Sequence, residues 1–185
     1  DGATWKLYRL DASDDPTLIG ALSGKPDLEV FNGKLHVADT AQLKDVTTGW
    51  VMATIAGAPK ASQVSQLYNR LIATGDPDNP ATLWYSHDVK STALFDQQPI
   101  DDADGGEIVA HRIHKGQIWI WKRKPATVHT IMGFESPSVM VRAQAYEKVT
   151  ALNHWGVISS GDDLVWPGHK GVMSLRKLKM FEALV

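Results

Sequence analysis

Histidine is the side chain best suited to bind a metal or to move a proton near neutral pH. The chain has seven: His36, His87, His111, His114, His129, His154 and His169. Two ligands share one face when they lie two residues apart on a strand or four apart on a helix. His111 and His114 are three apart in a strand-like segment, which predicts that they point to opposite faces. The spacing therefore favours ordinary surface or half-buried histidines over a metal site.

A second group of potential metal ligands surrounds Gly105-Gly106. It consists of Asp101, Asp102, Asp104 and Glu107. A calcium loop needs alternating oxygen ligands, a glycine for its turn and a glutamate at its twelfth position. That series is incomplete here, so a polar loop between strands is the favoured interpretation. A weak cation site is the alternative.

Patterns typical of nucleophilic or nucleotide chemistry are missing. The chain has no cysteine, which excludes thiol nucleophiles and disulfides. It has no Gly-x-Ser-x-Gly elbow, no Walker loop and no dinucleotide-binding glycine pattern. Ser160-Gly161-Asp162 begins like the Asp box of sialidase-type propellers, but Leu164 stands where that box needs a glycine. We therefore expect no enzyme, no catalytic or metal-binding residues and no cofactor.

Tryptophan is abundant for a chain of 185 residues. The seven are Trp5, Trp50, Trp84, Trp119, Trp121, Trp155 and Trp166. Exposed together they would form a platform for sugars or a partner protein, and buried they would fill a core. Trp119 and Trp121 share one strand face and Ile118 and Ile120 the other, which predicts a strand buried on both sides. Core packing is the favoured interpretation.

The charge balance argues against nucleic-acid binding. Nineteen basic and 21 acidic residues give a net charge of −2, whereas such domains usually carry a basic excess. The tight basic run Lys122-Arg123-Lys124 is expected to be a solvated strand end or hairpin turn. Apolar stretches are only a few residues long, far short of the roughly 20 that a membrane-spanning helix needs. We expect neither a specific nucleic-acid site nor a membrane partner.

The chain consists of short β-rich runs broken by Gly, Pro, Asn and Asp, a pattern that predicts an all-β fold. In residues 59–68 the apolar residues show weak helical spacing but also alternate with polar residues, and a strand is the favoured interpretation. Four times the chain has an apolar strand, a polar turn and a second strand. The second strands begin at Leu35, Leu71, Ile118 and Leu164, with spacings of 36, 47 and 46 residues. Further strands are expected at 42–43, 83–85, 128–132 and 171–175.

A period near 40 residues with about four short strands is typical of a propeller blade. Such a sheet must stack on neighbours to bury both faces. We therefore predict a β-propeller or propeller-like repeat of about four small antiparallel sheets, forming a single β-repeat domain over residues 1–185. A β-sandwich is the alternative. Asp1 in place of a methionine and the abrupt end at Val185 fit an incomplete arc of a larger ring.

Residues 73–86 carry a resemblance to a known family. Gly75 to Pro80 form a Gly-Asp-Pro-x-x-Pro turn, and the strand that follows ends in Tyr85-Ser86. This resembles the β-propeller head-to-tail connector and tail proteins of tailed bacteriophages, of the packaged-DNA stabilisation and tail nozzle or tubular type. Residues 114–132 and 155–175 resemble the family's following hairpins, so the likeness extends from about residue 24 to residue 178.

The resemblance implies a non-enzymatic structural protein in the virion tail or connector, assembled in the host cytoplasm. It implies a homo-oligomeric ring around the DNA channel, in contact with portal, adaptor or other tail proteins. A carbohydrate- or receptor-binding propeller is the rival hypothesis, and a propeller hydrolase is the third. Tryptophans gathered in one concave pocket would favour the rival, whereas burial between sheets would favour the structural role.

Two expectations concern loops and edges. Pro77 and Pro80 fix φ, so the 76–80 loop is predicted to be exposed and rigid. Strand edges near Leu7 and Leu175 lack protecting charges or prolines and are expected to pair with a neighbouring subunit or a further part of a longer chain.

Overall fold

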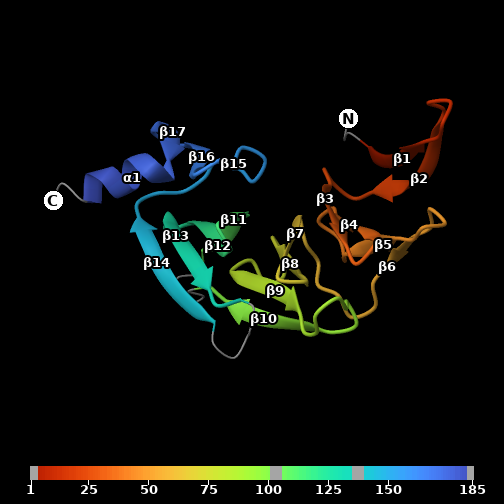
Figure 1. Cartoon of the computed structure of the whole chain (residues 1–185), viewed down its shortest axis with the longest axis horizontal. Helices are drawn as coiled ribbons and strands as arrows, with labels where there is room; N and C mark the ends of the chain where they lie inside the picture. Colours follow the sequence, from red (N-terminus) through yellow and green to blue (C-terminus); the bar gives the residue numbers. More distant parts are fainter. Residues whose placement is uncertain (1–3, 101–105, 135–139, 183–185) are drawn as a thin grey trace. The chain divides into compact units, whose positions relative to one another are not determined.

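The computed structural model describes residues 4–100, 106–134 and 140–182 (Figure 1). Within them the chain forms seventeen strands and one helix. The strands belong to five small antiparallel sheets, which confirms the all-β class. No helix in these ranges is long and apolar enough to cross a lipid bilayer.

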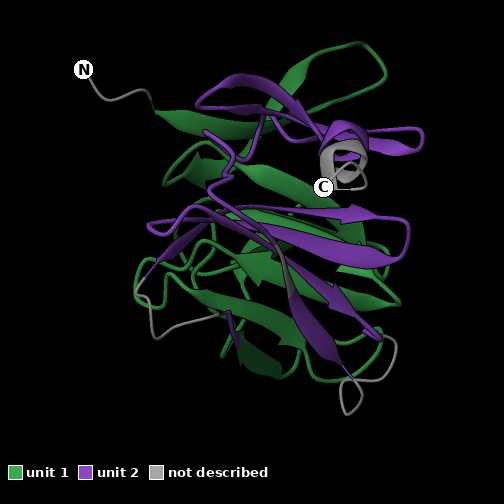
Figure 2. Ribbon diagram, turned by 90° about the vertical axis from the view of Figure 1, so that its left-hand side faces the viewer, with its two compact units in different colours: residues 1–98 green, residues 99–185 purple. Residues whose placement is uncertain are grey.

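The chain divides into two compact units, residues 1–98 and 99–185, coloured separately in Figure 2. Unit 1 holds three sheets. The first consists of β1 (Trp5–Leu10) and β2 (Pro16–Leu22). The second consists of β3 (Asp27–Phe31), β4 (Lys34–Ala38), β5 (Lys44–Val46) and β6 (Met52–Thr54). The third consists of β7 (Gln63–Leu67), β8 (Arg70–Thr74), β9 (Thr82–Ser86) and β10 (Phe95–Pro99), whose last residue falls beyond the boundary.

Unit 2 holds two sheets and the helix. The larger sheet consists of β11 (Glu107–His114), β12 (Gln117–Arg123), β13 (Thr127–Met132) and β14 (Val141–Glu147). The smaller sheet consists of β15 (Ile158–Ser160), β16 (Asp163–Gly168) and β17 (Gly171–Ser174). Helix α1 (Leu175–Glu182) follows β17 without a break.

Every sheet is a meander, because its strands are neighbours in the same order as in the sequence. The four predicted hairpins are confirmed as β3–β4, β7–β8, β11–β12 and β15–β16. The first turn is the one that the sequence predicts: Asn32 and Gly33 both have positive φ, 48° and 73°, as a two-residue type I′ turn needs. The second turn lies one residue earlier than predicted, at Tyr68 and Asn69, because Arg70 already belongs to β8. The later strands are confirmed at 83–85, 128–132 and 171–174, whereas the one expected at 42–43 begins two residues later as β5.

In unit 1 the sheets stack face to face through alternating side chains. Leu35 and Val37 of β4 lie in an apolar cluster with Leu7 and Leu22 of the sheet β1–β2. The next residue along β4, Ala38, points the other way and joins a second cluster. That cluster packs the sheet β3–β6 against the sheet β7–β10 and contains Phe31, Ala38, Leu43, Ile55, Ala58, Ala61, Val64, Leu71 and Ala73. The two-residue period of a strand thus gives the sheet β3–β6 two apolar faces.

In unit 2 one aromatic cluster packs the sheet β11–β14 against the sheet β15–β17. Its buried members are Ala110, Trp119, Trp121, Val128, Tyr146, Ala151, Val157, Leu164, Trp166 and Leu175. Trp121 and Trp166 meet edge to face, with 5.2 Å between ring centroids. Ile118 and Ile120, on the other face of β12, are also buried, which confirms the prediction of a strand buried on both sides.

Helix α1 corrects the expectation of a strand edge near Leu175. The strand β17 ends at Ser174, whose hydroxyl accepts a hydrogen bond from the Lys177 N–H (3.3 Å). The Asp163 carboxylate accepts one from the Arg176 N–H (2.9 Å). These two side chains satisfy N–H groups of the first helical turn, so a helix starts where the apolar pattern of β17 had suggested further extended chain. Leu175 is buried in the aromatic cluster of unit 2.

Candidate functional site

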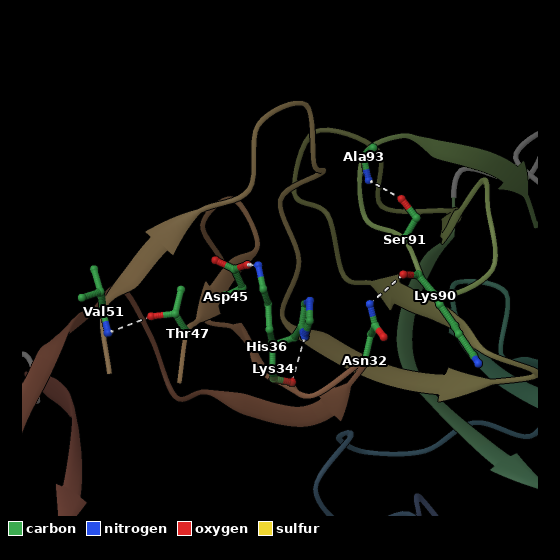
Figure 3. Close-up of polar contacts among 9 residues, drawn as sticks. All are labelled: Asn32, Lys34, His36, Asp45, Thr47, Val51, Lys90, Ser91 and Ala93. Carbon is green, nitrogen blue, oxygen red and sulfur yellow. Dashed lines mark hydrogen bonds and ion pairs between the residues drawn. The ribbon is translucent and has the colours of Figure 1, made fainter. Parts of the chain in front are cut away.

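A pocket of about 540 Å³ opens in unit 1 between the β3–β4 hairpin and the loop that joins β9 to β10 (Figure 3). Its lining residues are Phe31, Asn32, Lys34, His36, Ile55, Ala56, Lys90, Ser91, Thr92 and Ala93. The volume is in the range of small-molecule sites. It is a candidate site within the part of unit 1 that the structure describes.

Two asparagines at hairpin turns position the loop that forms one wall of this pocket. The Asn32 side-chain amide donates to the Lys90 carbonyl (2.8 Å), and the Lys90 N–H donates to the Asn69 carbonyl (2.7 Å). Lys90 has a φ of 56°, so the loop turns sharply between the two bonds. The two bonds therefore tie the loop to both hairpin turns.

His36 lies in the lining of the pocket and is 1% exposed. Its Nδ1 is 3.3 Å from the Lys34 carbonyl, which can only accept, so Nδ1 carries the proton. Burial lowers the pKa of His36 below its ordinary value, against smaller raising effects from the Lys34 carbonyl and from Asp45. The neutral ring therefore leaves Nε2 as an acceptor, and this atom has no hydrogen-bond partner among the described residues.

Other polar groups around the pocket are held by partners within the protein. The Lys34 ammonium pairs with Asp45 at 2.6 Å, and the Ser91 hydroxyl accepts a bond from the Ala93 N–H (3.2 Å) (Figure 3). Nε2 of His36, the atom that acts as the base in a nucleophilic triad, has no serine hydroxyl or other hydrogen-bond partner among the described residues. The arrangement holds the loop on the hairpin and offers a small cavity, but it shows no nucleophile beside a base.

The histidines predicted to lie at the surface or to be half-buried are more buried than expected. His111 and His114 are both buried, because the large aromatic residues of unit 2 carry the sheet β15–β17 over this part of β11. His114 Nδ1 lies 2.9 Å from the Ser159 hydroxyl, and the His111 and His154 rings are 6.0 Å apart. Across the described residues, no three His, Asp or Glu side chains come close enough to bind a metal.

The acidic loop falls mostly outside the described residues, which leave out Asp101, Asp102 and Asp104. Glu107 is described and begins β11. Its carboxylate pairs with Arg123 at 2.8 Å. Glu107 therefore takes part in an ion pair between neighbouring strands.

The basic run contains one clear correction. Lys122 is fully buried, not solvated, and its ammonium donates to the Ile100 carbonyl (2.6 Å). Lys122 follows Trp121 on β12, and alternation points it to the face of Ile120 and Ile118. The buried part of β12 therefore extends to Lys122, its sixth residue. Arg123 and Lys124 are at the strand end and turn as expected.

The tryptophans divide into two groups. Trp119, Trp121 and Trp166 are buried in the unit 2 cluster, and Trp84 packs against the apolar cluster between the sheets β3–β6 and β7–β10. Trp5, Trp50 and Trp155 are exposed. The only aromatic rings that line the described pocket are those of Phe31 and His36, so the tryptophans form no platform there.

The 76–80 loop is exposed from Pro77 to Pro80, as predicted. Asp76, however, is buried, and its carboxylate accepts bonds from the Asp78 N–H (2.9 Å) and the Asn79 amide (3.0 Å). Sequence reasoning missed this carboxylate as the element that shapes the turn, although Asp followed two residues later by a polar residue is a known turn signal.

Two further polar groups gave no usable signal in the sequence. Asp39 is fully buried, accepts a bond from the Ser23 N–H (2.8 Å) and pairs with Lys44 at 2.5 Å. Arg112 donates two bonds to the Val157 carbonyl, at 3.0 and 2.8 Å, and so joins β11 to the segment before β15. The bonds to Ser23 and Val157 reach backbone atoms 16 and 45 residues away and cannot be recognised from residue spacing.

No protein-family model matches the sequence, and no curated protein matches it.

Proposed function

We propose that this chain is a non-enzymatic structural protein of a tailed-bacteriophage virion, in the tail or head-to-tail connector. In this proposal the small sheets are blades of a propeller or propeller-like arc, and the chain contributes to a homo-oligomeric ring around the DNA channel. Its partners are other tail, adaptor or portal proteins, and its place is the virion.

The observation that carries the proposal is the succession of meander sheets. In unit 1 three consecutive sheets stack face to face, and in unit 2 two do so, each through side chains that alternate along the strands. Propeller blades are also small meander sheets stacked face to face, and this similarity supports the proposal. It also agrees with the resemblance of residues 24–178 to the connector and tail proteins of tailed phages.

The polar groups support a structural role over catalysis. Asn32 and Ser91 are engaged in holding a loop, Lys34 joins β4 to β5 through Asp45, and Arg112 and Asp39 hold strands and loops. Such bonds between elements make a rigid module, which suits a protein that acts through its shape and its contacts. Three tryptophans buried between sheets fit the same role.

The rival function, binding of a carbohydrate or receptor, depends on the unit 1 pocket. The His36 Nε2 acceptor and the Phe31 ring are the features that a sugar would use. The pocket has no tryptophan in its lining, so the structural role is the better supported of the two.

Imaging of purified particles of the phage or prophage that encodes the chain tests the proposal. Particles labelled with antibody against the chain, followed by single-particle reconstruction, are expected to place it in a ring at the tail vertex. Absence of the protein from purified particles, together with specific binding of a glycan that a His36→Ala variant loses, would replace the structural role by the rival one.

A further inference from the structure

The sheet β1–β2 buries one face and exposes the other. Leu7 and Ile19 pack in the cluster with Leu22, while Tyr8 pairs with Leu18 across a bulge that shifts the register. Alternation places Tyr8, Leu10 and Leu18 on the opposite side. These three, here called the N-terminal face, are 47%, 65% and 53% exposed.

The sheet β15–β17 shows the same division. Leu164, Trp166 and Met173 point into the aromatic cluster of unit 2. The register pairs Val165 with Ile158 and Pro167 with Val172, which places these four side chains on the other side. They are here called the C-terminal face: Ile158, Val165, Pro167 and Val172. Ile158 is 57% exposed and Val172 is 76% exposed.

The turns beside the two faces carry opposite charges. The β1–β2 turn contains the exposed acids Asp11, Asp14 and Asp15 and lies next to Leu10. The β16–β17 turn contains the exposed His169 and Lys170 and lies next to Val172. Two hairpins stacked in the same direction would bring the acidic turn to the basic turn and Leu10 and Leu18 onto Pro167 and Val172. The two faces are therefore complementary in both apolar character and charge.

We infer that the N-terminal face of one copy packs on the C-terminal face of a second copy of this chain. The inner faces of the same two sheets already pack on neighbouring sheets in this way, through apolar side chains at alternate positions. Because the faces differ, the contact is heterologous, and each added copy presents a new free face of either kind. The contact thus builds a closed ring or an open arc.

This inference names the contact surfaces of the ring and rests on the proposed function for its place in a virion. The contact itself is tested with the purified chain. Because the chain has no cysteine, single cysteines can report one contact without background. We would prepare Leu18→Cys and Val172→Cys as separate proteins, mix them and oxidise them under mild conditions.

Mixed Leu18→Cys/Val172→Cys disulfide dimers are expected in several-fold excess over those formed by a control pair. The control is Val89→Cys mixed with Val172→Cys, because Val89 is exposed in the β9–β10 loop and belongs to neither face. Equal yields in the two mixtures would overturn the inference. A chain with both Leu18→Cys and Val172→Cys should give a ladder of oligomers, and closure into a disulfide-linked monomer at low concentration would also overturn it.

A charge exchange separates the stacked arrangement from chance collision. Lys170→Glu should reduce the mixed-dimer yield, and Asp15→Lys on the opposite chain should restore it, with both effects weakened by high salt. Both positions are exposed, and circular dichroism would check that the variants stay folded. Loss of yield without restoration would contradict the alignment of the two turns.

The two proposals fail in distinguishable ways. If the Leu18→Cys/Val172→Cys disulfide forms in solution but the protein is absent from purified particles, the contact between copies is supported and the virion role is contradicted. A ring in the particle whose reconstruction shows other surfaces in contact would retain the virion role and remove this inference.

Discussion

Units 1 and 2 solve the same packing problem with different side chains. The cluster between the sheets β3–β6 and β7–β10 includes four alanines, whereas the cluster between the sheets β11–β14 and β15–β17 includes three tryptophans and a tyrosine. Small side chains fill little space, and unit 1 adds loops tied by buried polar bonds such as those of Asp39. Large rings fill the space directly in unit 2. The comparison shows that one meander topology tolerates either solution if the volume between sheets is filled.

The largest expected effect on stability comes from removing a buried aromatic side chain of unit 2. Trp121→Ala removes a fully buried side chain and its edge contact with Trp166. The cavity should lower the free energy of unfolding by about 3–5 kcal/mol, as for other buried aromatic residues. Urea unfolding followed by circular dichroism measures the loss. Trp155→Ala, at an exposed ring, is the matched control, and equal effects of the two substitutions would contradict the aromatic core.

The corresponding substitution in unit 1 removes a buried polar side chain. Asp39→Ala leaves the Lys44 ammonium, whose side chain is 15% exposed, without its buried carboxylate and removes the acceptor of the Ser23 N–H. The expected loss is about 3 kcal/mol, typical of breaking a buried pair from one side. The same unfolding experiment applies. Asp78→Ala, which removes the exposed pair with Lys60, should change stability little. A small effect of Asp39→Ala would mean that unit 1 depends on apolar packing alone.

The smallest expected effect is a pH dependence that belongs to unit 1. Burial lowers the pKa of His36, so the unfolded chain binds the proton more tightly than the folded one. The contribution of the neutral His36 ring to the free energy of unfolding is complete above pH 6.5. It is lost as the pH falls below this value, by at most about 1.4 kcal/mol per pH unit. Urea midpoints at pH 7.5 and pH 5 should differ less in His36→Gln than in the wild type. His87→Gln, at an exposed ring paired with Asp96, should retain the difference.

Much of the fold could be predicted because it depends on local patterns. The period of two in 117–123 and the Asn32-Gly33 dipeptide predicted strands and a hairpin turn from neighbouring residues alone, and both are confirmed. Leu175 was placed wrongly because a helix start depends on Asp163, which lies twelve residues earlier and reaches it only through the sheet.

The candidate site was less predictable for the same reason. The pocket is formed by the β3–β4 hairpin and a loop some 55 residues later, joined by the bond from Asn32 to Lys90. Neither segment carries a motif. The buried state of Lys122 and His114 also escaped prediction, since burial depends on what another sheet places over a strand.

By itself the sequence determined the class of the fold and the four hairpins. These follow from side-chain alternation and turn chemistry, which act over a few residues. Only the tertiary structure decided which faces of neighbouring sheets meet, which tryptophans are buried, and which charges are held away from water. Those outcomes depend on the volume and partners available between sheets, and such contacts join residues that are far apart in the chain.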